Sequence, residues 1–374
     1  MAARKVSAYF LRDTRHGGPA SQPQTTANRL AAFIADAVSM LEVAVYDFRL
    51  TDTDLAATVV DALTGAAKRG VTVRLAYDAG KPTTGTASMF ARLAADPAPS
   101  GTAQWVANNF GNSDVQIHAI TAPSGQLMHS KFVVRDGAKA AATSAVWTGS
   151  ANWTDDAWTL QENNIITVSS PAVAAAYMTD FEQLWAAGSI KATGVNDTGT
   201  ATVGRASVGW NFAPGGGLAI DAGLVAAVTG ATKRVVIATM VLTSLRVLDA
   251  LVAAITRGVP VTGIYDSGQM TPIEKEWTKS RSAASAAALA AWTTIKPNLV
   301  AKRSTPYQPT SPHDFMHDKI LITDEELFTG SYNFSANAEK NAENQLNIQA
   351  NVTLIEHYVD YIAAITAAYR QTRS

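Results

Sequence analysis

Short apolar runs alternate with longer segments of helical periodicity along this chain, and the same order occurs twice. The apolar runs are 41–46, 71–77, 235–240 and 259–265, and the segments of helical spacing between them are 54–68 and 245–256. Apolar runs of that length are typical of buried strands. A strand, a helix and a second strand in this order predict a parallel pair with a right-handed crossover, so the chain is predicted to be α/β.

The two halves also share a residue register. Identical residues stand 188 positions apart at Asp61/Asp249, Arg69/Arg257, Tyr77/Tyr265, His129/His317, Lys131/Lys319 and Asp136/Asp324. Further on, Asn152/Asn333 and Glu162/Glu343 keep an offset of 181, which predicts a seven-residue insertion within 137–146. So many matches in one register indicate an internal duplication.

A Gly-, Thr- and Ser-rich connection from about 188 to 217 separates the halves. We therefore predict two homologous domains, 1–195 and 196–374. Each half is expected to open with a strand, at 8–10 and 210–212, and to end with an aromatic-bearing helix, at 172–185 and 354–369.

Composition narrows the class of protein. The 374 residues are 47% hydrophobic and 16% charged, which excludes a disordered or fibrous chain. The formal net charge of −1 argues against a globally basic nucleic-acid coat, and the lack of cysteine excludes thiol chemistry and disulfides. No apolar run is long enough to span a membrane and no signal-peptide pattern is visible. We expect a cytoplasmic protein, or a secreted one whose leader has been removed.

The duplicated chemistry is an H-x-K-x4-D motif, at 129–136 and 317–324. On a strand, residues i and i+2 share a face, so the histidine and lysine of each motif should project together. A G-S-x-N motif follows at 149–152 and 330–333, and a glutamate comes ten residues after each of its asparagines.

This constellation resembles the phospholipase D superfamily, whose signature is two such motifs. The resemblance covers most of the chain. It implies two α/β domains, each a mixed β-sheet flanked by helices, related by a pseudo-two-fold axis with one active site at their interface. It also implies phosphodiester chemistry without a metal ion. By the same resemblance we expect His129 to be the nucleophile and His317 the general acid and base.

The residue types suit these roles. Lysines and amides can stabilise the charge on phosphate oxygens, and an imidazole can attack phosphorus or transfer protons. A carboxylate on the other ring nitrogen would fix the histidine tautomer. The expected roles are catalysis by His129, Lys131, His317 and Lys319, phosphate binding by Asn152, Asn333, Ser150 and Ser331, histidine orientation by Glu162 and Glu343, and organisation of the site by Asp136 and Asp324.

We predict no metal site and no cofactor. The chain has no H-E-x-x-H motif and no Cys/His cluster. His313 and His317 are four residues apart, a spacing that could bind metal on a helix, but His317 is better explained as part of a strand motif.

Two substrate classes remain open. A phospholipid is favoured by the near-zero net charge and by loops carrying Met89, Phe90, Trp105, Trp277 and Trp292, which allow peripheral contact with a membrane surface. A nuclease is favoured by the tail of the second motif, 333–344, which resembles bacterial endonucleases of the superfamily.

The segments that precede the two motif histidines are expected to be long, irregular and to roof the site. The second of them is basic, with Lys275, Lys279, Arg281, Lys296, Lys302 and Arg303. That charge suits a nucleic-acid backbone or an anionic lipid surface. We favour hydrolysis or transfer at a phospholipid headgroup, by a chain that as a monomer holds both halves of the site. A cardiolipin synthase is disfavoured because such enzymes carry N-terminal membrane segments. A non-catalytic phosphate-binding protein is the third alternative.

Overall fold

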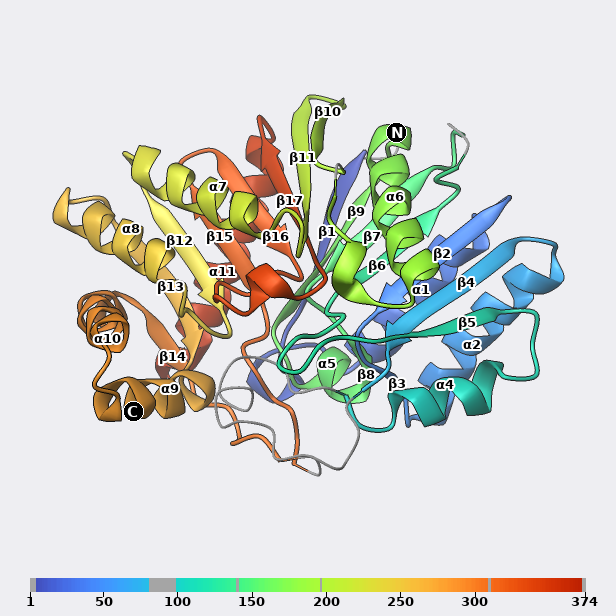
Figure 1. The fold of residues 1–374 in the computed structure, drawn as a ribbon, viewed down its shortest axis with the longest axis horizontal. Coiled ribbons are helices and arrows are strands. Elements are labelled where there is room, and N and C mark those ends of the chain that lie inside the picture. The colour runs from blue at the N-terminus through green and yellow to red at the C-terminus, as the bar shows by residue number, and fades with distance from the viewer. Residues whose placement is uncertain (1–4, 81–98, 139–140, 196, 309–310, 372–374) are drawn as a thin grey trace.

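The computed structural model describes residues 5–80, 99–138, 141–195, 197–308 and 311–371. In this part of the chain two large β-sheets stand side by side with helices packed against them (Figure 1), which confirms the α/β prediction. Met89 and Phe90, expected in a substrate-facing loop, lie outside the described residues.

The first sheet is mixed and, in the described residues, has seven strands in the order β1-β9-β7-β6-β2-β4-β5. Its strands are β1 (Val6–Leu11), β2 (Met40–Val45), β4 (Thr72–Asp78), β5 (Gln116–Ile120), β6 (Lys131–Arg135), β7 (Ala145–Gly149) and β9 (Asn163–Val168). The run β2-β4-β5 is parallel and the remaining pairs are antiparallel. The parallel β2-β4 pair is the one that the hydrophobic pattern predicted.

The second sheet repeats this plan, with eight described strands in the order β10-β11-β17-β16-β15-β12-β13-β14. They are β10 (Gly199–Val203), β11 (Ala206–Ala213), β12 (Val235–Thr239), β13 (Val261–Asp266), β14 (Val300–Lys302), β15 (Lys319–Thr323), β16 (Glu326–Gly330) and β17 (Glu343–Gln349). A further two-stranded sheet pairs β3 (Phe48–Arg49) with β8 (Trp153–Thr154). The extra seven residues of the first half lie in the β6-β7 connection, as predicted. The chain leaves the first sheet at the end of β9 and enters the second at the start of β10. The boundary at 195/196 stays a prediction.

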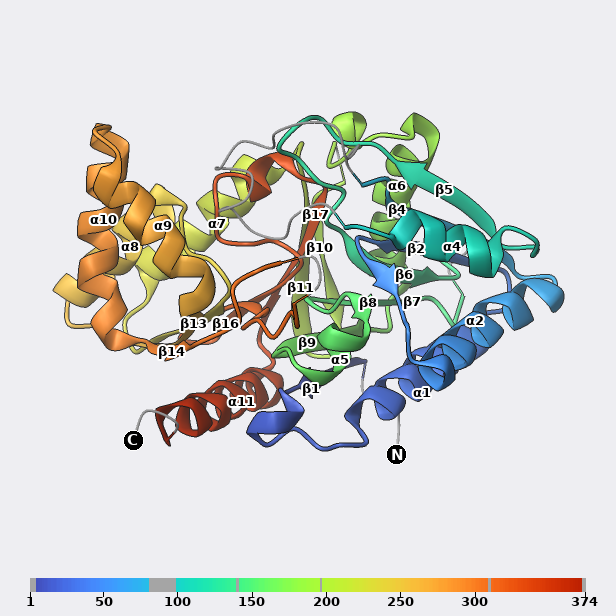
Figure 2. The ribbon, with the colours of Figure 1, turned by 90° about the horizontal axis from the view of Figure 1, so that it is seen from below.

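Helices cover the outer faces of both sheets (Figures 1 and 2). The α-helices are α1 (Gln22–Ala35), α2 (Thr53–Lys68), α4 (Thr102–Phe110), α5 (Asp155–Thr159), α6 (Pro171–Ala187), α7 (Gly217–Gly230), α8 (Leu245–Thr256), α9 (Ser267–Lys279), α10 (Ala283–Ile295) and α11 (Val352–Gln371). Short 3₁₀ turns are η1 (Thr14–His16), η2 (Ile190–Ala192), η3 (Lys296–Asn298) and η4 (Ala338–Lys340). The segment before the second motif was predicted to be irregular. That is wrong, because it folds into α9, α10 and β14.

Helix α2 shows why these segments become helices. The Asp52 side chain accepts hydrogen bonds from two backbone N–H groups of the first turn, which would otherwise lack partners. Its buried side chains recur every three or four residues, at Leu55, Val59, Leu63 and Ala66. That stripe packs on one face of the first sheet, where the odd-numbered side chains of β2 point.

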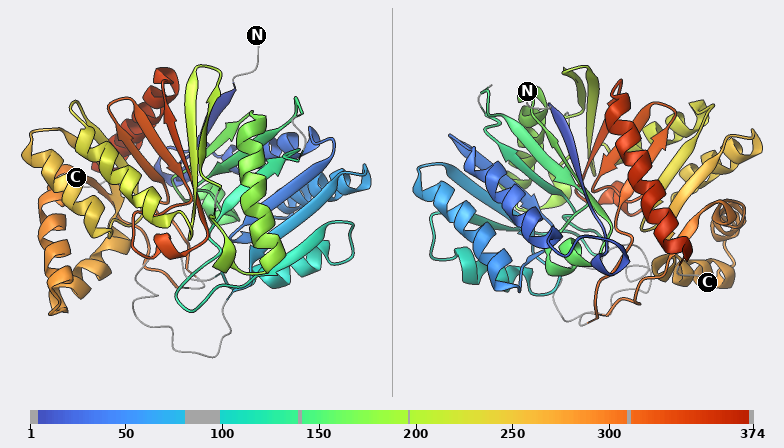
Figure 3. Two further views of the ribbon diagram at one scale, coloured as in Figure 1. Left: turned by 45° about the horizontal axis from the view of Figure 1, so that its top comes forward. Right: turned by 180° about the vertical axis from the view of Figure 1, so that it is seen from behind.

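The opposite faces of the two sheets share one hydrophobic core that spans both halves. The C-terminal helix of each half also packs on the opening strand of the other half. Tyr177 of α6 makes an edge contact with Phe212 of β11, and Tyr358 of α11 makes the equivalent contact with Phe10 of β1, each with ring centroids 4.8 Å apart. Figure 3 shows α11 running beside β1. The halves are therefore interlocked, which holds their motif strands in a fixed relation.

Candidate active site

Each motif histidine stands where the two halves meet. His129 and His317 are completely buried, two residues before the first residues of β6 and β15. The backbone N–H of His129 donates to the Ala342 carbonyl at 2.8 Å, and that of His317 donates to the Glu162 carbonyl at 3.0 Å. Reciprocal backbone hydrogen bonds thus bind each motif to the opposite half.

A buried aspartate fixes the approach to each histidine. Asp78, at the end of β4, accepts the backbone N–H of Met128 at 2.7 Å, and Asp266, at the end of β13, accepts that of Met316 at 2.8 Å. Burial raises the pKa of Asp266 to about 6, against hydrogen bonds that favour its charged form. Both aspartates recur at the 188-residue offset, but the sequence pattern predicted no role for either.

A carboxylate from the second half holds the ring of His129. Glu343 Oε2 lies 2.8 Å from His129 Nδ1, and its other oxygen accepts from the side-chain amide of Asn341 at 3.1 Å. The Tyr46 ring lies 4.9 Å from the imidazole, centroid to centroid. Glu343 therefore occupies the position expected of a histidine-orienting residue.

An amide holds the ring of His317 instead. Asn163 Oδ1 lies 2.9 Å from His317 Nδ1. The Asn163 amide nitrogen donates to Ala157 O and Gln161 Oε1, both at 3.1 Å, which fixes the oxygen toward the ring. Because an amide oxygen can only accept, Nδ1 of His317 carries a proton in this arrangement.

The prediction that Glu162 orients a histidine is therefore corrected. The backbone oxygens of Asn164 and Asn344 accept from the serine N–H of their own G-S-x-N motif, at 3.0 and 2.9 Å. On these strands the repeat offset is 180 rather than 181, so the structural counterpart of Glu343 is Asn163. Glu162 is displaced by one position along the extended chain, and its side chain points to the other side.

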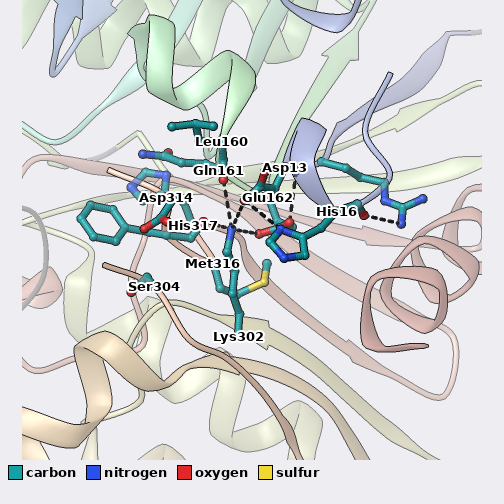
Figure 4. Close-up of polar contacts among 12 residues, drawn as sticks. Asp13, His16, Leu160, Gln161, Glu162, Lys302, Ser304, Asp314, Met316 and His317 are labelled. Atoms are coloured by element: carbon teal, nitrogen blue, oxygen red, sulfur yellow. Dashed lines mark hydrogen bonds and ion pairs between the residues drawn. The ribbon is translucent and has the colours of Figure 1, made fainter. Parts of the chain in front are cut away.

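Glu162 instead belongs to a buried polar cluster between the halves (Figure 4). Its carboxylate is 2.5 Å from the ammonium of Lys302 and accepts from the hydroxyl of Tyr369 at 2.6 Å and from the backbone N–H of Asp13 at 3.2 Å. Lys302 is 1% exposed, so this ion pair has almost no contact with solvent. The cluster ties η1, β14 and α11 to the segment that presents His317.

The serines of the G-S-x-N motifs support the orienting groups. Ser150 Oγ donates to Asn163 Oδ1 and Ser331 Oγ donates to Glu343 Oε2, each at 2.7 Å. Each hydroxyl also accepts the backbone N–H of the following residue on β9 or β17. The expectation that they bind phosphate is corrected, because these contacts occupy the hydroxyls.

The two lysines are placed alike. Lys131 Nζ donates to the His129 carbonyl at 2.8 Å and Lys319 Nζ to the His317 carbonyl at 2.6 Å. Lys131 Nζ also lies 4.9 Å from the centroid of the Tyr46 ring. Both ammonium groups are thus held next to the histidine of their own motif, and their catalytic role stays a prediction.

The asparagines of the G-S-x-N motifs have buried polar atoms without partners. Among the described residues these are Asn152 Oδ1 and both amide atoms of Asn333. Leaving such groups unpaired in the folded state costs free energy unless a ligand satisfies them. The amide nitrogen of Asn333 is a donor and suits a phosphate oxygen, whereas the two amide oxygens are acceptors and need a donor such as a hydroxyl.

Asp136 and Asp324, the last residues of the two motifs, lie at the opposite end of their strands, roughly 20 Å from the histidines. Asp136 accepts from the backbone N–H groups of 38–40, and Asp324 from those of 232–234. Both residues have positive φ, 52° and 25°. The expectation that they organise the site is corrected: they fasten the turn at the far end of each sheet.

The residue between histidine and lysine differs between the motifs. Asp318 is fully buried, accepts from Asn164 Nδ2 at 2.8 Å, and lies 2.7 Å from the Tyr361 hydroxyl. Burial raises its pKa to about 6, against these hydrogen bonds. Ser130 is its counterpart, so the environment of the two motifs is not symmetric.

Comparison with known proteins agrees with this geometry. The family model described as "Cardiolipin synthase, PLD-like domain" matches residues 30–185 and 224–366, which is most of the chain. The chain belongs to the phospholipase D superfamily. Its two matched regions correspond to the two halves seen here, and members of this superfamily carry out phosphodiester chemistry.

Individual relatives of this phospholipase D-like chain match less of it. The mitochondrial cardiolipin hydrolases of Xenopus laevis and Xenopus tropicalis are each 39% identical over 62 residues, 17% of this chain and 27% of theirs. The chain thus aligns with about a quarter of the length of these curated relatives.

Solved structures match over almost the whole length. Phosphatidylserine synthase of Haemophilus influenzae Rd KW20 has a TM-score of 0.62 at 11% identity, covering 98% of this chain and 86% of that one. Polyphosphate kinase of Porphyromonas gingivalis has a TM-score of 0.55 at 13% identity, covering 96% and 50%. These likenesses support the fold alone.

The roof over this phospholipase D-type site is less basic than the sequence suggested. Lys302 is consumed by its buried ion pair, and Lys296 is paired with Glu274 at 2.8 Å. The basic side chains that stay exposed are Lys275, Lys279, Arg281 and Arg303. Trp292 is fully buried, and Trp105 is half-buried against the Phe48 ring.

The described residues contain no group of three or more His, Asp or Glu side chains that could hold a metal ion. Within the same ranges, none of the helices has the length and apolar character needed to cross a membrane.

Proposed function

We propose that this protein cleaves phospholipid headgroup phosphodiesters without a metal ion, through a phosphohistidine on His129. The observation that carries the proposal is the reciprocal site between the halves: each buried motif histidine is held through Nδ1 by the opposite half. Because Nδ1 is engaged by the opposite half, we assign the chemistry to Nε2 in both residues.

In this proposal Nε2 of His129 attacks phosphorus, and His317 protonates the departing alcohol oxygen. His317 then takes a proton from water or from an acceptor alcohol, whose oxygen attacks phosphorus and breaks the P–N bond. Lys131, Lys319, Asn152 and Asn333 would stabilise the charge on the non-bridging oxygens. The unpartnered amide nitrogen of Asn333 supports this assignment for that residue.

A phospholipid substrate is supported by the family match and by the similarity to the mitochondrial cardiolipin hydrolases of Xenopus. A nuclease is the second candidate, because four exposed basic side chains, Lys275, Lys279, Arg281 and Arg303, surround α9, α10 and β14. Such a group of charges could follow a nucleic-acid backbone.

One purified preparation tests the proposal. With EDTA present, the protein is incubated with vesicles of phosphatidylcholine or cardiolipin, with plasmid and single-stranded DNA, and with bis(p-nitrophenyl) phosphate. We expect release of headgroup from vesicles and of nitrophenol from the diester. Cleavage of DNA without lipid turnover would select the nuclease, and loss of all activity with EDTA would refute the metal-independent mechanism.

The matched variants are His129→Ala and His317→Ala. Each should lower kcat by at least about a hundredfold, the scale of one general acid or base. Val38→Ala, which changes an exposed side chain at the far end of the first sheet, serves as the control for purification and folding. Full turnover in either histidine variant would contradict the proposed roles.

A further inference from the structure

Two chemically different groups hold the two motif histidines. His129 Nδ1 faces the Glu343 carboxylate at 2.8 Å, whereas His317 Nδ1 faces the Asn163 amide oxygen at 2.9 Å. Both partners are fully buried, and each accepts a hydrogen bond from the serine of its own half. Asn163 and Glu343 thus hold their histidines in the same way but differ by one charge.

That charge affects the two chemical roles differently. A histidine that bears phosphorus on Nε2 and a proton on Nδ1 is cationic, and a carboxylate at hydrogen-bond distance stabilises it. A neutral amide fixes the same tautomer but stabilises the cation less. A histidine held by an amide therefore releases its proton to a leaving group more readily.

We propose that Asn163 is a positioning residue that commits His317 to acid and base catalysis, while Glu343 commits His129 to carry phosphorus. This inference rests on the proposed function and adds a division of labour to it. In the first step the His129 Nε2–P bond forms, the P–O bond of the leaving group breaks, and the Nε2 proton of His317 passes to that oxygen. In the second step water attacks phosphorus, the P–N bond breaks, and His317 recovers a proton from that water.

Other charged groups lie next to His317 or contact its backbone or its neighbours, and their effect must be separated from that of Asn163. They are Asp318, the next residue; Lys319, whose Nζ donates to the His317 carbonyl; Asp266, which accepts the backbone N–H of Met316; and the Glu162–Lys302 pair, in which the Glu162 carbonyl accepts the backbone N–H of His317. Among the carboxyl groups, Asp318 is the adjacent one. Asp318→Asn is therefore the matched control.

The first test measures kcat against pH with bis(p-nitrophenyl) phosphate for the wild-type protein and two variants. Asn163→Asp should move the basic limb, which reports a protonated His317, upward by about one pH unit or more. Glu343→Gln should move the acid limb, which reports a neutral His129, downward. The proposal would be overturned if Asn163→Asp moved the acid limb and Glu343→Gln moved the basic limb. It would also be overturned if neither variant moved a limb while the wild-type protein turns over.

The second test does not depend on turnover. Histidine ¹⁵N NMR follows the titration of His317 in the wild-type protein, Asn163→Asp and Asp318→Asn. We expect an Nδ1–H tautomer in the wild-type protein and a midpoint raised by Asn163→Asp beyond any change from Asp318→Asn. An Nε2–H tautomer, or an unchanged midpoint in Asn163→Asp, would contradict the role of Asn163 even if no phosphodiester is cleaved. If Asn163→Asp raised the titration midpoint of His317 in a protein that cleaves no phosphodiester, the proposed function would be wrong but the role of the Asn163 contact would be supported.

Discussion

At the scale of single residues, Asp318 breaks the symmetry of the duplication most clearly. It occupies the position of Ser130 in the first motif, and its carboxyl is completely buried beside Asn164 and Tyr361. Lys319, the next residue, favours its charged form, yet burial outweighs that and raises the pKa of Asp318 to about 6. The charged carboxylate is therefore a cost to the folded state at neutral pH.

This cost predicts a specific pH dependence. Because the folded state binds the Asp318 proton more tightly than the unfolded chain does, its contribution is fully present below about pH 4 and is lost as pH rises through about 6. From the values of 3.8 and about 6, the loss amounts to about 3 kcal/mol. Urea unfolding at pH 4.5 and pH 7.5 should show Asp318→Asn gaining most of that amount relative to the wild-type protein. An equal difference between the two proteins at both pH values would contradict the prediction.

At the scale of elements, the ends of the motif strands have separate functions. The starts of β6 and β15 carry the histidines and lysines, and their far ends carry Asp136 and Asp324 in positive-φ turns. Hydrogen bonds from Thr143 and from the backbone of Ser39 and Met40 outweigh burial and lower the pKa of Asp136. Each strand thus fastens, at one end, the segment that leads into its neighbour β2 or β12, while its other end lies next to the motif histidine where the halves meet.

Asp136→Ala should accordingly damage stability and spare chemistry. The variant leaves several backbone N–H groups unpaired and puts alanine at a φ of 52°, which should lower the free energy of unfolding by about 1–3 kcal/mol. Since Asp136 is in contact with none of the motif histidines, kcat of the folded variant should stay within about twofold of wild type. A fall in kcat of a hundredfold at unchanged stability would return Asp136 to the active site. The same carboxylate stabilises the fold above its ordinary pKa, and that contribution disappears as pH falls below it.

Much of the element order was predictable because buried parallel strands and the helices between them leave strong apolar periodicity. The residues 41–46, 71–77 and 54–68 became β2, β4 and α2 within one residue or so at each end. The partner of His317 was not predictable. Glu162-Asn163 and Glu343-Asn344 look identical as dipeptides, and only the strand pairing shows that one extra residue shifts the first by one position.

The irregular segments were harder for a different reason. Helix α9 is mostly polar and charged, and α10 consists largely of alanine. Neither sequence therefore shows the regular alternation of apolar and polar positions that marks α2. The role of Lys302 depends on a carboxylate 140 residues away, which no local pattern contains. Long-range ion pairs and strand register are properties of the folded chain.

At the scale of the whole molecule, the two halves share a core, and the C-terminal helix of each half also packs on the opening strand of the other. The Glu162–Lys302 pair lies inside this junction, beside Asp13 (Figure 4). The hydroxyl of Tyr369, from α11, also donates to Glu162. An ion pair without solvent is costly to break, because the remaining charge stays buried.

Lys302→Met should therefore lower the free energy of unfolding by about 3–5 kcal/mol in chemical denaturation. The double variant Lys302→Met/Glu162→Gln should recover part of the loss, because no uncompensated carboxylate remains at that position. Lys275→Met, which changes an exposed lysine, is the matched control and should stay within about 0.5 kcal/mol of wild type. If Lys302→Met unfolds at the same denaturant concentration as that control, the pair does not stabilise the junction.

We propose that the two half-sites form one phosphodiesterase in which His129 forms the covalent bond to phosphorus. The most direct measurement is to react the His317→Ala variant with a phosphodiester, quench it at alkaline pH, and locate the adduct by mass spectrometry of its peptides. We expect a phosphoryl adduct on the peptide that contains His129 in His317→Ala, and no adduct on that peptide in His129→Ala. An adduct on another residue, or the absence of any adduct from a variant that still binds substrate while the wild-type protein turns over, would contradict it.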